Sequence, residues 1–191
     1  IIIGILLLIV LIGYFSISGK YNKMVELDES VSAKWANVET QYQRRLDLIP
    51  NLVNTVKGFA EQEKEVLLGV TEARANASSI KIDPSNLDAS SIQKFQQAQG
   101  QLGSALSRLL VTVERYPELK SNQNFLELQA QLEGTENRIA VERKRFNETV
   151  QAYNTYIRRF PNNMFAGMFG FEKRPMFEAE VGAEKAPEVE F

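Results

Sequence analysis

The sequence predicts an all-α protein in which an N-terminal transmembrane helix is followed by an antiparallel, up-and-down helical bundle. Three observations predict this fold class. The chain opens with an uncharged apolar run, large apolar residues then recur every seven positions, and turn-forming residues divide the remainder into long segments. With 191 residues, 44% of them hydrophobic, one compact domain with appendages is expected. The expected parts are an anchor at 1–19, a bundle at 20–160, an aromatic-rich segment at 161–181 and an acidic, disordered tail at 182–191.

The apolar run reads IIIGILLLIVLIGYFSIS, and the first charge is Lys20. Eighteen residues in a helix rise about 27 Å, which is close to the hydrocarbon thickness of a bilayer. A signal peptide cleaved near Ser16–Ser18 is the alternative. We favour a retained anchor because the run is long for a signal core and leads directly into helix-forming sequence. The anchor residues, with two aromatic residues near an interface, are Ile1, Leu6, Leu11, Tyr14 and Phe15.

A long amphipathic first helix is expected from about Tyr21 to Asn76. Its apolar residues follow two interleaved heptad tracks: Val31, Val38, Leu52, Phe59, Val66 and Ala73, and Trp35, Tyr42, Ile49, Val56, Val70 and Ala77. Pro50 lacks a backbone donor and crowds the preceding turn, so the helix either kinks or divides there. The unbroken heptad phase favours the kink. The bundle therefore has three long helices, or four if the first divides at Pro50.

Two further helices follow a turn-forming connector at residues 78–86. Ser90 and Gln93 resemble a capping box at the start of the second helix, which stops at Tyr116-Pro117. The third begins near Ser121 or Asn122, carries a large apolar residue every seven positions and ends before Pro161. The short connector between them predicts antiparallel neighbours, and the heptads predict left-handed packing like that of coiled coils.

The composition argues against catalysis and against nucleic acid as a partner. Twenty-two Lys and Arg residues against 24 Asp and Glu residues leave a net charge of -2, which provides no basic field for phosphates. The sequence has no His and no Cys, so it offers no Ser-His or Cys-His pair and no imidazole or thiolate ligand. Carboxylate di-metal bundles require Glu-x-x-His pairs, and glycine-rich phosphate or dinucleotide motifs are absent from the sequence. We expect no enzyme, no metal and no cofactor.

Several sequence blocks occur together in one order: Tyr21-Asn22, residues 44–53 (RRLDLIPNLV), residues 71–74 (TEAR), residues 114–120 (ERYPELK), Asn124-Phe125, residues 134–139 (GTENRI), Tyr153-Asn154 and Phe160-Pro161. Over about residues 21–177 the chain resembles the LemA family. The resemblance implies a bacterial single-pass protein of the cytoplasmic membrane with a helical bundle and no assigned activity. Gln62-Glu63 stands where the family usually has His before Glu, which argues against histidine chemistry there. Lys20 and Lys23 favour a cytoplasmic bundle without fixing the side.

Charged residues at core phase are the candidate site. Arg45 and Glu63 occupy the apolar tracks, and Glu136 lies next to the apolar track of the third helix. A buried ion-pair network would fix helix register. The alternatives are side chains that snorkel to the bundle edge and a ligand site. The residues assigned to the network, with those of the family signature, are Arg45, Asp47, Pro50, Asn51, Glu133, Glu136 and Asn137.

Two apolar regions are candidate interfaces. The aromatic segment from Met164 to Phe177 either folds back on the open end of the bundle or docks on a membrane or a neighbouring subunit. The membrane end of the first helix extends beyond the shorter helices, which predicts a homo-oligomer. The candidate interface residues are Trp35, Phe165, Phe169 and Phe171. The expected function is a scaffold that binds lipid through its anchor and assembles with copies of itself or with other membrane or envelope proteins. The alternative is a ligand-sensing or signalling subunit that uses the kink at Pro50.

Overall fold

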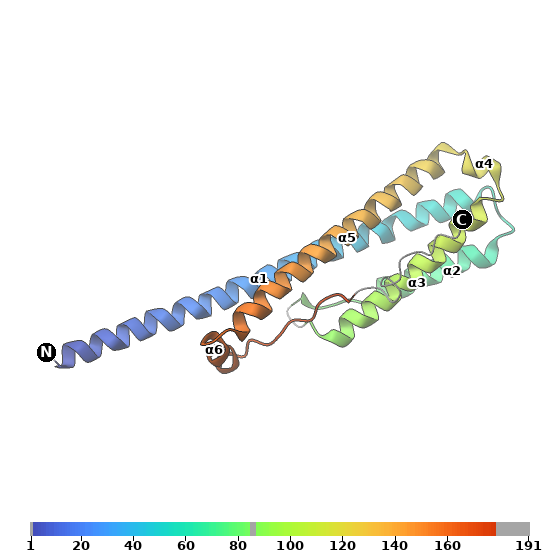
Figure 1. Ribbon diagram of the computed structural model, residues 1–191. Coiled ribbons are helices and arrows are strands. Elements are labelled where there is room, and N and C mark those ends of the chain that lie inside the picture. The colour runs from blue at the N-terminus through green and yellow to red at the C-terminus, as the bar shows by residue number, and fades with distance from the viewer. Residues whose placement is uncertain (1, 85–86, 179–191) are drawn as a thin grey trace, which may run out of the picture.

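The computed structural model describes residues 2–84 and 87–178, which form an all-α fold without strands. The six helices are α1 Ile2–Lys57, α2 Lys64–Ser79, α3 Ala89–Val113, α4 Pro117–Lys120, α5 Gln123–Arg158 and α6 Asn162–Phe169 (Figure 1). The predicted fold class is confirmed. The anchor residue Ile1, the end of the aromatic segment from 179 and the acidic tail 182–191 lie outside the described residues.

Helix α1 joins the apolar N-terminal run to the bundle without a break. By length and composition it can cross a membrane, and none of its most apolar stretch is covered by the described part of the chain. The side chains of Leu6, Leu11, Tyr14 and Phe15 are exposed. Burial begins at Met24, where α5 and α6 come to lie against α1. One helix therefore carries both the candidate membrane span and one wall of the core.

The long first helix ends earlier than the sequence predicts. It runs through Pro50 to Lys57, the chain turns at residues 58–63, and α2 returns alongside α1 (Figure 1). The expectation of one helix continuing to Asn76 is wrong, because the chain reverses after Lys57 and does not divide at Pro50. A lysine in the last turn followed by Gly58 is a common helix-stop signal.

The bundle is built from two helix pairs. α5 runs antiparallel along α1, and α3 runs antiparallel along α2 (Figure 1). α4 connects α3 to α5, yet α5 packs mainly on α1 and α3 mainly on α2. The sequence predicted direct pairing of the segments that became α3 and α5. The unforeseen return of α2 supplies α3 with a different partner.

Side-chain caps fix the starts of two helices. The Asn122 side-chain oxygen accepts a hydrogen bond from the Phe125 amide at 3.1 Å, so α5 begins where predicted. The Asp88 carboxylate caps α3 by accepting from the Ser91 amide at 2.9 Å. The capping box expected at Ser90 is therefore replaced, and the Ser90 hydroxyl donates to Asp88 at 2.7 Å. Hydrogen bonds from Ser91 and then Ser90 hold the pKa of Asp88 well below its usual range.

Two apolar cores fill the bundle, one nearer the span and one at the far end. The first reaches Tyr42 along α1, and the second begins at Leu46. Polar residues lie between the cores, and we call this set the polar layer: Arg45, Gln99, Thr135 and Glu136. Helices α1, α3 and α5 contribute to both cores, with polar groups at the junction.

Trp35 lies in the first core, enclosed by its own chain. It is 1% exposed and packs against Phe95, Phe146 and Phe177, with ring centroids 5.5, 5.6 and 5.7 Å away. Met24, three turns earlier on α1, is also buried. The expectation that this track stays bare for a second copy is wrong, because α5, α6 and the chain after α6 cover it.

Candidate functional site

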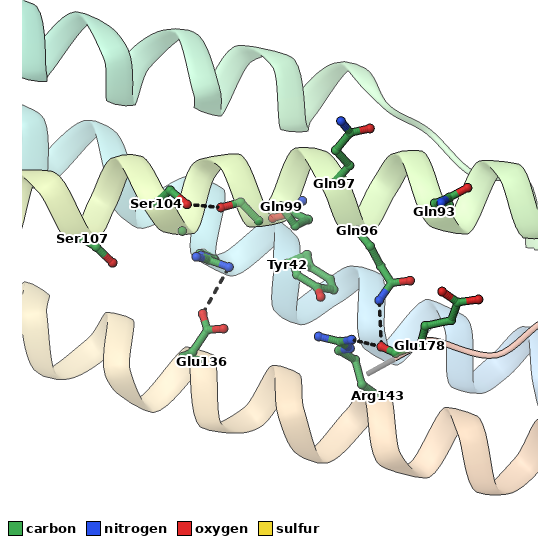
Figure 2. Close-up of a pocket in the computed structure, with 13 residues that line it drawn as sticks. Tyr42, Gln93, Gln96, Gln97, Gln99, Ser104, Ser107, Glu136, Arg143 and Glu178 are labelled. Atoms are coloured by element: carbon green, nitrogen blue, oxygen red, sulfur yellow. Dashed lines mark hydrogen bonds and ion pairs between the residues drawn. The ribbon is translucent and has the colours of Figure 1, made fainter. Parts of the chain in front are cut away.

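A polar cavity of about 750 Å³ opens between α1, α3 and α5 at the level of the polar layer (Figure 2). Helix α3 contributes amide and hydroxyl side chains, while α1 and α5 contribute a phenol and charged groups. The lining residues are Tyr42, Arg45, Gln93, Gln96, Gln97, Gln99, Gly100, Gly103, Ser104, Ser107, Glu136, Arg143 and Glu178. With both signs of charge and many amides, this wall suits a small polar molecule better than an apolar one.

Arg45 forms the cavity's buried charge. It is 7% exposed, and its Nη1 lies 3.2 Å from Oε2 of Glu136, whose side chain is 57% exposed. A Cβ at Gly103 would lie 3.2 Å from Arg45 Nη2, so the missing side chain gives the guanidinium room. The cation is thus enclosed while its partner stays hydrated, which lowers the desolvation cost of the pair.

Gln99 brings an unsatisfied polar atom to the same wall. The residue is 4% exposed, and its Oε1 has no hydrogen-bond partner among the described residues. Buried amide oxygens almost always accept a hydrogen bond, since an unpaired one costs roughly 1–3 kcal/mol. Gln99 therefore brings a buried oxygen that lacks a partner among the described residues to the edge of the cavity.

Most residues assigned to the network from sequence lie elsewhere. Asp47 accepts from Gln43 on its own helix at 2.7 Å, and Glu133 accepts from Gln129 at 3.1 Å. Pro50, Asn51 and Asn137 are exposed and do not line the cavity. Of the assigned set, the structure brings Arg45 and Glu136 together at this site.

Glu63, the other charged residue on an apolar track, lies in the turn before α2. Its Oε1 accepts from the Tyr116 hydroxyl at 2.9 Å and lies 3.1 Å from Arg115 Nη2. The hydrogen bond to Glu63 raises the pKa of Tyr116. This contact ties the turn to the end of α3.

Arg74 is a structural residue that the sequence analysis missed. Its Nε donates to the Leu46 carbonyl at 2.8 Å. In an uninterrupted helix that carbonyl accepts from the amide four residues later, and here that residue is Pro50, which has no N–H. Arg74 therefore replaces the donor that Pro50 lacks. Arg74 and Pro50 both belong to the family-like blocks, but no spacing rule links them.

Residues 171–178, which we call the strap, run back along the bundle after α6. Asn154 exchanges two hydrogen bonds with the Arg174 backbone (2.8 and 2.9 Å), and Asn147 does the same with Phe177 (3.0 and 2.9 Å). Seven helical residues rise about 10 Å, and three extended residues span about the same length. The two asparagines therefore match the strap's repeat.

Further bonds fasten both ends of the strap. The Tyr153 hydroxyl donates to the Glu172 carbonyl at 2.9 Å, and Arg174 Nε lies 2.9 Å from Asp28 Oδ1. At the other end, Gln96 and Arg143 donate to the Glu178 carbonyl at 3.1 and 3.2 Å (Figure 2). The strap thereby closes one side of the polar cavity.

The aromatic segment folds back on the bundle, which is one of the two alternatives that the sequence predicts for it. Phe165 and Phe171 pack partly buried against the first core, and Tyr21 contacts Phe169 and Phe171 with centroids 5.0 and 5.7 Å apart. Phe169 remains partly exposed. The segment therefore covers the membrane end of α1 with its inner face and leaves an outer face bare.

The family model described as the LemA family matches residues 34–191, which include Pro50, Arg74, the cavity and the strap. The chain belongs to the LemA family. It is similar to the magnetosome protein MamQ of Magnetospirillum gryphiswaldense (27% identical, covering 86% of this chain and 67% of that protein). It is also similar to the magnetosome protein MamQ 2 of Paramagnetospirillum magneticum (26%, with the same coverage) and to Protein LemA of Metamycoplasma hominis (22%, covering 92% and 77%). With its apolar helix, this LemA-family chain is a membrane-associated protein.

Proposed function

We propose that this LemA-family protein is a non-catalytic scaffold, anchored by a single pass in the cytoplasmic membrane. The observation that carries the proposal is the continuity of α1, which passes from exposed apolar residues into core positions without a break. A continuous helix fixes both the height and the rotation of the bundle above its anchor. A surface held in one orientation suits assembly with copies of itself or with other envelope proteins.

Membrane anchoring also favours association. Copies that share one orientation in two dimensions meet at a high effective concentration, so modest contacts suffice for assembly. The apolar track around Trp35 no longer supports self-assembly, because the chain covers it itself. Contacts between copies are therefore expected on the outer faces of the helices, where cross-linking can detect them.

The test uses two insertions between Gly19 and Lys20. A flexible Gly-Ser insertion uncouples the bundle from the span, whereas a seven-residue helical insertion nearly preserves its rotation. We expect wild type to form an assembly of defined size in native membranes without added ligand, and the helical insertion to keep it. The flexible insertion should lose the assembly while keeping its helical content. A wild-type protein that stays monomeric in native membranes and in mild detergent would contradict the scaffold.

Ligand sensing is a second candidate, favoured by the polar cavity and by the Gln99 oxygen beside it, which has no partner among the described residues. Gly100 lines this cavity, and a Cβ there meets no described atom within 4 Å, so Gly100→Leu is a variant that places a side chain on the cavity wall. The unfolding temperature of the full chain would be measured with amino acids, amides and amines as probes. A sensor predicts a rise for one of these probes in wild type and none in Gly100→Leu. If no probe raises the unfolding temperature of either protein, ligand sensing is contradicted and the scaffold remains the proposed function.

A further inference from the structure

The end of the bundle nearest the span carries a bare apolar face. Phe160, Met164 and Met168 are 81%, 63% and 73% exposed. On α6, Asn162 and Ala166 face inward and are buried, so the two methionines, four positions apart, share the outer side of the helix. Removing these three large apolar side chains from water would be favourable.

Helix α6 lies where α1 leaves its apolar run. Lys20 Nζ donates to Asn162 Oδ1 at 3.1 Å, and the Tyr21 ring meets Phe169. Lys20 and Tyr21 closely follow Ser18 on α1. Helix α6 therefore contacts α1 within about 5 Å of the end of the apolar run. Figure 1 shows α6 beside α1, at the end of α5 that points toward the N-terminus.

Basic residues border this apolar face. Arg158 and Arg159 directly precede Phe160 and are exposed, and Lys173 is exposed just beyond α6. Apolar side chains flanked by cations are typical of segments that lie in a lipid interface, where anionic headgroups attract the cations. A two-fold contact between copies would instead place the arginine pairs of two chains near one another, which disfavours a second copy as occupant.

We propose that α6 docks on the membrane that α1 spans. Phe160, Met164 and Met168 enter the headgroup region, and Arg158 and Arg159 lie among anionic lipid headgroups. Docking gives the bundle a second point of attachment, which stops it from tilting about the end of the span.

The test exploits the absence of cysteine from the sequence. Single-cysteine variants of the full chain are labelled with a nitroxide. They carry Met164→Cys, Met168→Cys or, as a control at an exposed position of α3, Val111→Cys. Each protein is reconstituted in vesicles of phosphatidylcholine and phosphatidylglycerol, and relaxation by oxygen is compared with relaxation by a water-soluble nickel chelate. All three positions are exposed, and circular dichroism verifies the fold of each variant.

We expect the ratio of oxygen to nickel accessibility at positions 164 and 168 to be several-fold higher than at 111. In phosphatidylcholine alone the ratio should fall, and Arg158→Gln with Arg159→Gln should lower it only when phosphatidylglycerol is present. Equal ratios at all three positions would place α6 in water and overturn the proposal. Protection from both reagents together with spin-spin broadening would show a second copy on this face, and would also overturn it.

Discussion

Pro50 shows at the residue scale how a helix tolerates an interior proline. Such a residue costs about 3 kcal/mol in an isolated helix, partly because one carbonyl loses its donor. Here the Leu46 carbonyl receives the Arg74 guanidinium of α2, and α1 continues to Lys57. The reversal of the chain after α1 is what brings Arg74 to this carbonyl.

Replacing Arg74 should therefore matter more with Pro50 present than without it. We expect Arg74→Met to lower the free energy of unfolding by about 1–3 kcal/mol, because it leaves a carbonyl unpaired. In the Pro50→Ala background the new amide can serve Leu46, so the same change should cost less. A denaturant-based double-mutant cycle measures the coupling, with exposed Arg108→Met as the control. Additive effects would disprove the link.

Two glycines of α3 form a matched pair. Gly→Ala inside a helix normally stabilises by about 0.5–1 kcal/mol. At Gly100 nothing lies within 4 Å of a new Cβ, so we expect the full gain; at Gly103 the Cβ would press on Arg45 at 3.2 Å. Gly103→Ala should gain less or lose stability, because Arg45 is confined by burial and by Glu136. Thermal unfolding of both variants measures the difference. Equal gains in stability would show that the Arg45 side chain moves freely.

At the scale of elements, the strap depends on paired asparagines of α5. Asn147→Ala should remove the hydrogen-exchange protection of the Phe177 amide, and Asn154→Ala that of Arg174, since each amide donates to that asparagine. Exposed Asn137→Ala on the same helix serves as the control and should leave both amides unchanged. Protection that survives both substitutions would mean that other contacts of the strap are sufficient.

Tyr153 makes the attachment of the strap sensitive to alkaline pH. Burial, followed by the charge of Asp28, raises its pKa from 10.0 to about 12. The folded chain thus holds the phenol proton more tightly than the unfolded chain, so this contribution to stability is complete below pH 10 and is lost as the pH rises toward 12. Over that pH range the free energy of unfolding should fall more steeply with pH for wild type than for Tyr153→Phe. Parallel curves would contradict this assignment.

The sequence predicted helix content and core positions well, but not the direction of the chain. Val56 and Val70 share a heptad track and are both buried, although they lie on helices that run in opposite directions. Heptad phase reports which side of a helix is apolar, and it is unchanged when the chain reverses. The heptad pattern predicted that Arg45 lies on a core-facing position. It could not predict which helices surround Arg45, because that depends on the direction of the chain. The strap has no periodicity, so its asparagine pairing left no signal.

At the scale of the whole molecule, Trp35 joins elements from both ends of the chain. Its ring contacts α3, α5 and the strap. We expect Trp35→Ala to cost about 3–5 kcal/mol and to release the strap as well as loosen the bundle. Circular dichroism and chemical unfolding measure the loss, with exposed Val141→Ala as the control. Release of folded monomers with unchanged stability would instead indicate that Trp35 contacts a second copy.

In the proposed single-pass arrangement, the unbroken α1 also sets how far each part of the protein stands from the bilayer. Counted from Ser18 at 1.5 Å per residue, Arg45 and its cavity stand about 40 Å above the end of the span, and the turn after Lys57 stands nearly 60 Å above it. Lipid headgroups can therefore reach α6 but not the cavity. A molecule that fills the cavity would then arrive from the aqueous side, and a membrane-bound partner of the far turn would have to extend well clear of the bilayer.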